Sequence, residues 1–274
     1  MDETFLDYMF DPQTALGQFN SSLDYISFHY YGDFLGQTGS YGQVGSPTTA
    51  LKYITGRLSA KLAALGHPQT KFFISEWGPT TDVTSIINYS HLGASWAAAF
   101  LTEAVADNVV MGHYLVMSDA VGTQTTGDPG IASLVDKING VAYPKPVTNV
   151  FKMFNMMTGT RNAVSLPTDR PNLGAFAASS AGLVIFNYNS TFTTTDETVD
   201  VELDNLAFNG VVTVERYLVD AFTSNLWAYL QPGHPDPDPT LQRVEQFSAQ
   251  VINGKLLLPS RTLGASGVTF WRIH

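Results

Sequence analysis

The stretch Lys71-Phe-Phe-Ile-Ser-Glu-Trp-Gly-Pro79 indicates how the N-terminal half of this chain folds. It begins with a short apolar run that shows no alternation of apolar and polar residues, and Gly78-Pro79 ends it. Such runs are typical of strands that are buried on both faces, as in a parallel sheet. Two similar runs flank it, over residues 23–31 and 109–117. We therefore predict three parallel strands in this half.

Helical patterns separate these apolar runs. Ser46-Pro47 is typical of a helix N-cap followed by proline at the first helical position, and apolar residues then recur at steps of three and four as far as Leu65. Ser90 can cap a second helix, and Pro146 can open a third. Because strands and helices alternate along the chain, the sequence predicts parallel βα units.

After Gly159 the pattern changes to short runs that alternate between apolar and polar residues. These runs lie at residues 183–188, 198–206, 211–219, 255–258 and 268–271. Clusters of Asn, Gly, Ser and Pro separate them. Several short strands at such spacing are typical of an antiparallel β-sandwich. The expected fold class is therefore α/β plus all-β, with a first domain over residues 1–159 and a β-sandwich domain over residues 160–274.

Composition narrows the possible partners. The chain has 14 Lys and Arg against 24 Asp and Glu, a formal net charge of −10, so we expect it to bind neither nucleic acid nor an anionic membrane surface. Its 44% hydrophobic and 14% charged residues exclude a disordered chain. No apolar run is long enough to span a membrane, and the acidic N-terminus does not resemble a signal peptide. The compartment stays undecided.

Several kinds of chemistry lack their usual residues. The absence of cysteine excludes thiolate nucleophiles and cysteine-based metal sites, and the six histidines show no metal-ligand spacing. The sequence contains no Gly-x-Gly-x-x-Gly after a strand, no nucleotide-binding P-loop and no Gly-x-Ser-x-Gly elbow. We therefore expect neither a metal nor a cofactor.

A carboxylate, Glu76, follows the apolar part of the 71–79 stretch. The run before it ends in His29-Tyr30-Tyr31, and the run after it leads into Ser118-Asp119. Because the carboxyl ends of parallel strands meet at one edge of the sheet, these side chains can share a site there, with Trp77 as an apolar wall for a sugar face. Taken singly, each residue has a simpler reading, as a solvated loop glutamate, a structural histidine or a capping aspartate.

Three segments together resemble the C-terminal part of a glycoside hydrolase family 39 enzyme. They are Asp24-Tyr-Ile-Ser-Phe-His-Tyr-Tyr31, Ile74-Ser-Glu-Trp77 and Lys145-Pro-Val-Thr-Asn-Val-Phe-Lys-Met-Phe154. The segment Arg216-Tyr-Leu-Val-Asp220 and the proline-rich loop after it are similar to that family's β-sandwich. The family comprises β-xylosidases and their α-L-iduronidase relatives, and the Ser-Glu-Trp strand is shared by a wider clan of retaining glycosidases.

This resemblance implies a (β/α)8 barrel that cleaves β-xylosides or related glycosides by a retaining mechanism. It places Glu76 at the nucleophile, at the end of the seventh strand. His29 and Tyr31 fall on the sixth strand, where the family contacts the sugar and steadies the nucleophile. Met117-Ser-Asp119 matches the eighth strand and makes Asp119 a substrate contact, although the tryptophan common at that strand is missing.

The other half of such a site is absent from this sequence. Retaining hydrolysis needs a second carboxyl group as acid and base, which these families take from an Asn-Glu pair ending the fourth strand, and the sequence contains no Asn-Glu pair. Three βα units, equivalent to strands six to eight, make only a partial barrel. We therefore expect impaired activity, with Asp33, Asp119 or a group from a second protomer as surrogate acid.

A partial barrel leaves strand edges and barrel-facing side chains without partners. We expect the chain to bury them by forming a homo-oligomer, unless helices or the N-terminal segment fold over the open side. The alternative to an enzyme is a non-catalytic carbohydrate-binding protein, in which Trp77, Tyr31 and Trp227 hold a sugar, or a truncated fragment without activity.

Overall fold

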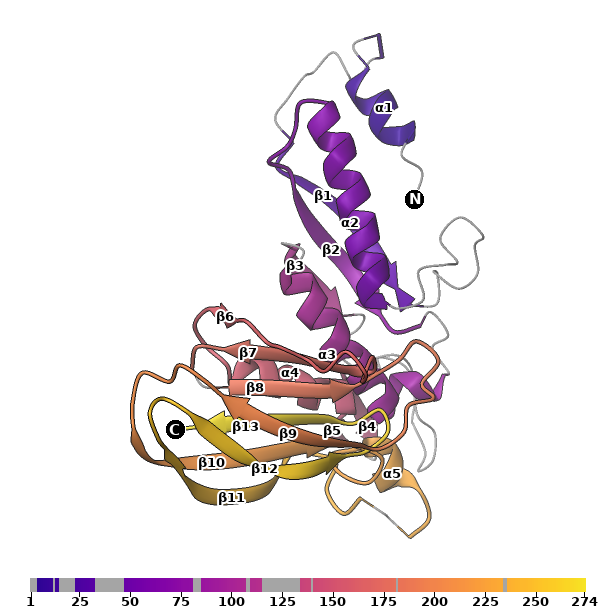
Figure 1. Ribbon diagram of the computed structural model, residues 1–274. Coiled ribbons are helices and arrows are strands. Elements are labelled where there is room, and N and C mark those ends of the chain that lie inside the picture. Colours follow the sequence, from indigo (N-terminus) through magenta and orange to yellow (C-terminus); the bar gives the residue numbers. More distant parts are fainter. Residues whose placement is uncertain are drawn as a thin grey trace.

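The computed structural model describes residues 4–11, 13–14, 23–32, 47–80, 85–106, 109–114, 134–138, 140–180, 182–233 and 236–274. Its N-terminal part contains three parallel strands in the order β1-β2-β3, namely Tyr25–Tyr31, Lys71–Gly78 and Val109–Tyr114. The helices α2 (Pro47–Ala64) and α3 (His91–Ala106) connect successive strands (Figure 1). A short 3-10 helix over Ile86–Asn88 precedes α3. The predicted parallel βα units are confirmed.

Residues at two of the predicted helix ends act as the sequence predicts, whereas the expected N-cap Ser46 lies outside the described residues. Gly66 has φ of +88°, a left-handed conformation that glycine adopts without strain, and it lies two residues after the end of α2. Its N–H donates to the carbonyl of Ala63 at 3.1 Å, while the N–H of His67 donates to the carbonyl of Leu62 at 2.8 Å. At the start of α3, the side chain of Ser90 accepts from the N–H of Leu92 at 3.4 Å.

The C-terminal part is dominated by antiparallel strands. A hairpin of β4 (Val135–Ile138) and β5 (Val141–Pro144) leads into α4 (Pro146–Asn155). A six-stranded sheet follows, in the order β11-β10-β13-β8-β7-β6: Gln242–Val251, Gly210–Val219, Val268–Ile273, Gly182–Asn187, Leu173–Ala178 and Arg161–Asn162. A two-stranded sheet pairs β12 (Leu256–Leu263) with β9 (Glu197–Leu203), and α5 spans Leu226–Leu230. The domain boundary at residue 160 stays a prediction.

The N-terminal helix α1 (Thr4–Phe10) packs against α2 (Figure 1). Its Leu6 joins Leu58 and Leu62 of α2 in a small buried cluster that also includes Phe72 of β2. Lys61 of α2 forms an ion pair with Asp7. The described part of the N-terminal segment therefore lies with the helix that covers one face of β1 and β2, and the opposite face of β1 carries exposed residues.

The largest core joins the parallel part to the six-stranded sheet. It includes Ala94, Ala97 and Phe100 of α3, Val150 and Met153 of α4, and Val184, Phe186, Val268 and Phe270 of β8 and β13. Because alanines occupy the buried face of α3, the helix can approach the sheet closely. The two parts of the chain therefore share one hydrophobic core.

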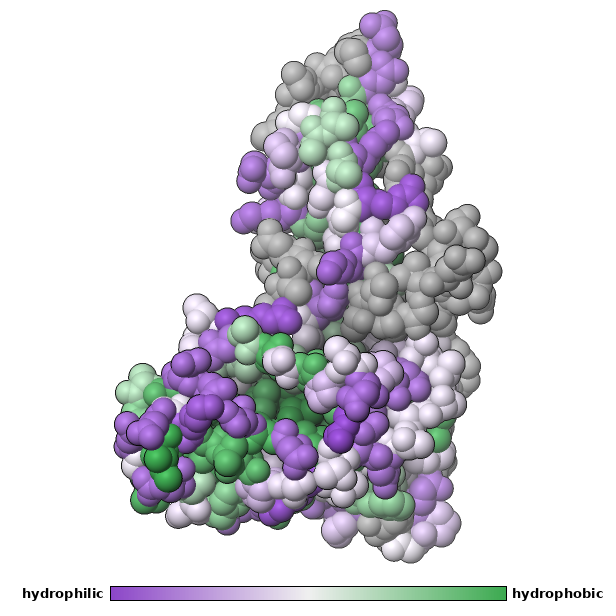
Figure 2. All heavy atoms as spheres, viewed as in Figure 1, coloured by the Kyte–Doolittle hydropathy of each residue, from purple (hydrophilic) through white to green (hydrophobic). Residues whose placement is uncertain are grey.

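A second core lies between the six-stranded and the two-stranded sheet. Side chains of β8, β10 and β13 meet those of β9 and β12 there, and Figure 2 shows hydrophobic residues gathered over this region within a hydrophilic surround. An ionic cluster crosses between the sheets: Glu245 of β11 accepts hydrogen bonds of 2.7–2.9 Å from Arg261 of β12 and of 2.6–2.7 Å from Arg216 of β10. These bonds, chiefly those from Arg261, hold the pKa of Glu245 below its usual range, although partial burial opposes them.

None of the described helices is both long enough and apolar enough to cross a membrane.

Replacing Glu245 should show how much this cluster stabilises the fold. Glu245→Gln should lower the free energy of unfolding at neutral pH by about 1–3 kcal/mol, because Arg216 is buried and would lose its counter-charge. The folded-state pKa lies below the unfolded value, so this stabilisation is present above the unfolded pKa of about 4.3 and is lost as the pH falls through the folded one. Urea unfolding at neutral pH and at about pH 3 measures both effects.

The matched control is Glu202→Gln, which removes an exposed carboxylate paired with Lys255. Exposed pairs contribute little, so this change should cost less than about 0.5 kcal/mol at neutral pH. If the free energies of unfolding of wild type and Glu245→Gln differed by the same amount at both pH values, the ionic origin of the stabilisation would be contradicted.

Candidate functional site

Glu76 lies near the C-terminal end of β2, beside the end of β1. The parallel register pairs it with His29, after an irregularity between Phe28 and His29 that shifts the pairing by one residue. Such bulges redirect side chains at strand ends. The register therefore brings together two residues that lie 47 positions apart in the sequence.

Two side chains of β1 reach the carboxylate of Glu76. The hydroxyl of Tyr31 donates a short hydrogen bond to Oε1. The Nδ1 atom of His29 lies 3.7 Å from Oε2, which is an ion-pair distance rather than a hydrogen bond. The Glu76 side chain is 29% exposed and that of His29 is 57% exposed, so the carboxylate lies at the surface, where a ligand can reach it.

Glycines make room for this arrangement. A Cβ at Gly78 would lie 3.3 Å from Cε1 of Tyr31, so the small residue lets the tyrosine ring lie against β2. A Cβ at Gly32 would lie 2.5 Å from the carbonyl oxygen of Pro79, closer than real contacts allow. The sequence marks both glycines as strand ends but does not show that they position Tyr31 and the end of β1; that signal appears only when the two strands are paired.

Trp77 lies in the core. It is 3% exposed, and its ring stacks on Phe100 at a centroid distance of 4.3 Å and on Trp96 at 5.9 Å. The edge of Tyr114 meets it at 5.1 Å. Because successive residues of a strand face opposite sides, burying Trp77 leaves Glu76 on the other face. The expectation that Trp77 offers a wall to a sugar gains no support from this placement, and we leave it out of the site.

The other expected site residues lie elsewhere. Asp119 and Asp33 fall outside the described residues. Trp227 belongs to α5, in the antiparallel part of the chain. In the part of the chain that the structure describes, no group of three His, Asp or Glu residues could hold a metal ion.

The geometry suits a carboxylate that acts as a nucleophile or as a ligand contact. One oxygen is held by a phenol hydroxyl, and the other faces an imidazole at the open edge of the sheet. A hydrogen bond to an ionised oxygen fixes the position of the carboxylate and restricts its rotation. The second oxygen, Oε2, can contact a bound molecule.

A double-mutant cycle tests the contact between Tyr31 and Glu76. Tyr31→Phe should lower the free energy of unfolding by about 1 kcal/mol, since it removes a partly exposed hydrogen bond to a charged group. In the Glu76→Gln background the same change should cost less, because its acceptor is no longer charged. Equal costs in both backgrounds, measured by urea unfolding, would show that the two side chains do not interact.

No protein-family model matches the chain, and no curated protein matches it in sequence. Solved structures do. A monomeric β-xylosidase from Caulobacter crescentus CB15 shares the fold at a TM-score of 0.69 and 17% identity, over 94% of this chain and 57% of that one. The glycoside hydrolase family 39 enzyme from Xanthomonas axonopodis pv. citri has a TM-score of 0.69 and 14% sequence identity, over 94% of this chain and 56% of that one.

A glucosidase from Croceicoccus marinus gives a TM-score of 0.63 at 16% identity, over 99% of this chain and 56% of that one. At sequence identities this low, the structural similarity establishes the fold alone. The chain spans little more than half the length of these enzymes. It resembles, in its fold, a part of a glycoside hydrolase family 39 enzyme.

Proposed function

We propose that the chain is a glycoside hydrolase-like protein that acts on β-xylosides or related glycosides, with Glu76 as the nucleophile. The observation that carries this proposal is the contact of Glu76 with Tyr31 and His29 at the ends of two adjacent parallel strands. The solved enzymes that share the fold support it, since two of them are described as a β-xylosidase and a glucosidase. His29 and Tyr31 serve as the residues that contact the sugar and hold the nucleophile.

The reaction would proceed through a covalent intermediate. Oε2 of Glu76 attacks the anomeric carbon, and the bond from that carbon to the leaving-group oxygen breaks with its electron pair. The leaving oxygen departs as an anion and takes its proton from solvent. Water then attacks the same carbon, gives up a proton to solvent and releases Glu76 as a carboxylate, so the two displacements together retain the configuration. Tyr31 keeps Oε1 in place during both steps.

In this proposal the three parallel strands correspond to strands six to eight of a (β/α)8 barrel, and the antiparallel sheets to the β-sandwich that follows it. The chain then lacks the half that carries the acid and base, in keeping with the absence of an Asn-Glu pair. Activity is therefore impaired and depends on the leaving group, because an aryl oxygen of low basicity leaves without a proton donor. Asp33, Asp119 or a group of a second protomer could serve as a weak surrogate.

Glu76→Ala should abolish the slow hydrolysis of 2,4-dinitrophenyl β-xyloside that the wild type shows, because the covalent step has lost its nucleophile. Sodium azide should restore product release in this variant and give a glycosyl azide of inverted configuration, which identifies Glu76 as the nucleophile. Absorbance at the nitrophenolate band and NMR of the sugar product are the measurements. The control Glu202→Gln, an exposed carboxylate on β9, should retain the wild-type rate.

Unchanged turnover in Glu76→Ala would end the proposal. A wild type that binds xylo-oligosaccharides yet releases no nitrophenolate would instead support the alternative, a non-catalytic carbohydrate-binding protein or truncated fragment. The missing Asn-Glu pair is the observation that favours this alternative.

A homo-oligomer follows from the same partial barrel. In the described part of the chain β1 pairs with β2 alone and is therefore an edge strand, the kind of strand on which a second chain can add. Along its open face Tyr25 is 50% exposed, and Ser27 and His29 are also exposed. The similar xylosidase described as monomeric has a chain of nearly twice the matched length. We infer that a second copy of this chain covers the edge and open face of β1.

Light scattering after size-exclusion chromatography should therefore give at least twice the chain mass of 29.8 kDa at micromolar concentration. Tyr25→Lys places a charge on the open face and should shift the protein toward the monomer. Val211→Lys is the control, since Val211 is apolar and even more exposed than Tyr25 but lies in the antiparallel part. A wild-type monomer that binds no hydrophobic dye would refute the oligomer without affecting the role of Glu76.

A further inference from the structure

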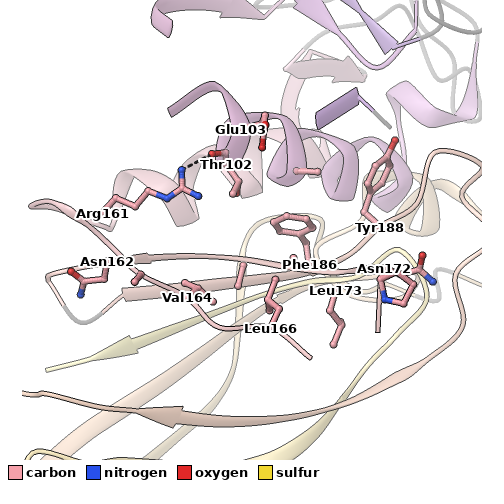
Figure 3. Close-up of a pocket in the computed structure, with 15 residues that line it drawn as sticks. Thr102, Glu103, Arg161, Asn162, Val164, Leu166, Asn172, Leu173, Phe186 and Tyr188 are labelled. Carbon is pink, nitrogen blue, oxygen red and sulfur yellow. Dashed lines mark hydrogen bonds between the residues drawn. The ribbon is translucent and has the colours of Figure 1, made fainter. Parts of the chain in front are cut away.

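A groove lies on the side of α3 that faces the six-stranded sheet, and none of the residues around Glu76 line it. Its walls are α3, the exposed segment that follows β6, and the strands β7 and β8 (Figure 3). It has a volume of about 440 Å³, within the range of roughly 300–1,000 Å³ that is usual for small-molecule sites.

The floor of the groove is apolar. Phe186 lies in its middle beneath α3 (Figure 3), and Ala99 of α3 and Ala175 of β7 also line the groove. A Cβ at Gly174 would lie 2.2 Å from Cε2 and Cζ of Phe186, so only glycine allows the ring to occupy this place. The floor therefore offers an aromatic ring among small side chains, a surface that packs against the C–H groups of a flat ligand.

The ends of the groove carry uncharged polar groups with free hydrogen-bonding capacity. Asn162 lies at one end, and Asn172 and Tyr188 lie at the other (Figure 3). Within the described part of the chain, neither asparagine amide makes a hydrogen bond, and neither does the hydroxyl of Tyr188. Burial raises the pKa of Tyr188 well above its ordinary value, so its hydroxyl stays protonated and can both donate and accept.

The charges at the rim nearly balance. Arg161 donates from Nη1 to the carbonyl of Thr102 at 3.1 Å (Figure 3). Its guanidinium lies 5.4 Å from the ring centroid of Phe176. These contacts hold its position while its other N–H groups stay available. Glu103 adds a carboxylate to the same wall. A single cation beside a single anion favours neither an anionic nor a cationic ligand.

We propose that this groove is a binding site for a short neutral oligosaccharide. Sugar hydroxyls donate and accept at once, which matches two amides and a phenol hydroxyl, and the C–H face of a pyranose ring packs on Phe186 and the alanines. A short peptide fits less well, because its backbone would have only the short edge of β7 at Leu173–Phe176 to pair with, since β6 already pairs with Ala177 and Ala178. The site does not depend on the proposed role of Glu76.

Saturation-transfer NMR on the full chain tests the proposal with xylotriose and cellotriose as probes. At least one of them should bind the wild type. Ala163→Trp places a large ring over the groove from an exposed position and should weaken that binding at least tenfold. Tyr188→Phe removes a single hydroxyl and should weaken it about three- to tenfold, the effect of one lost hydrogen bond.

Two controls separate this site from others. Tyr8→Phe, on the exposed face of α1, should bind as the wild type does, and so should Glu202→Gln, an exposed residue of β9 that lies outside both sites. If both trisaccharides fail to bind the folded wild type at millimolar concentration, the proposal is wrong. Binding that survives Ala163→Trp but is lost in Glu76→Gln also overturns it, because the sugar then occupies the site at β2.

Discussion

The packing of Trp77 on α3 determines which face of the parallel sheet carries the candidate site. Trp77 and Tyr30 both point into the core, where they meet Phe100 at centroid distances of 4.3 and 5.2 Å. Side chains alternate along a strand, so a register slip by one residue would turn every side chain to the opposite face. With Trp77 buried, Glu76 must face outward. The aromatic core therefore holds the carboxylate beside Tyr31 and His29.

The same helix explains how three parallel strands remain folded beside an antiparallel part. In a complete barrel, neighbouring strands would cover both edges of such a sheet. Here α3 and α4 pack on β8 and β13, and their side chains form one cluster with Trp77 and Ile74 of β2. The hydrophobic area that stabilises the parallel strands is thus buried against the six-stranded sheet. Little of it lies on the open face of β1, where Tyr25, Ser27 and His29 are exposed.

The sequence predicts the elements whose patterns are local. The parallel strands, the N-cap at Ser90 and the glycine after α2 are visible in the residues themselves, and they place Glu76 near a strand end. The expectation that these strands are buried on both faces is wrong for β1, because one of its faces is exposed. The polar strand β11, Gln242–Val251, is not visible in this way, because it lies at the edge of its sheet and one face is exposed. The strand β7, Leu-Gly-Ala-Phe-Ala-Ala, also escapes, since it has none of the β-branched residues that usually mark strands.

The candidate site, too, can be predicted from the sequence only in part. A strand-end glutamate and a neighbouring His-Tyr-Tyr run can be found from the sequence, because parallel strands end at a common edge. Which of the two faces each side chain occupies depends on the core, so the burial of Trp77 could not be read from its position beside Glu76. The groove at Phe186 is harder still, since it needs a helix, a loop and two strands that are distant in the sequence.

The helix α3 has different roles on its different faces. Trp96 and Phe100 pack beneath Trp77, while Ala99 and Thr102 face the groove. Residues 99 and 100 are adjacent, so a shift of the helix that widened the groove would also move the ring on which Trp77 rests. Interiors packed at such density transmit small displacements rather than absorb them. The position of α3 therefore determines both the shape of the groove and the packing of Trp77, the neighbour of Glu76. A shift of α3 that changes one of these would also change the other.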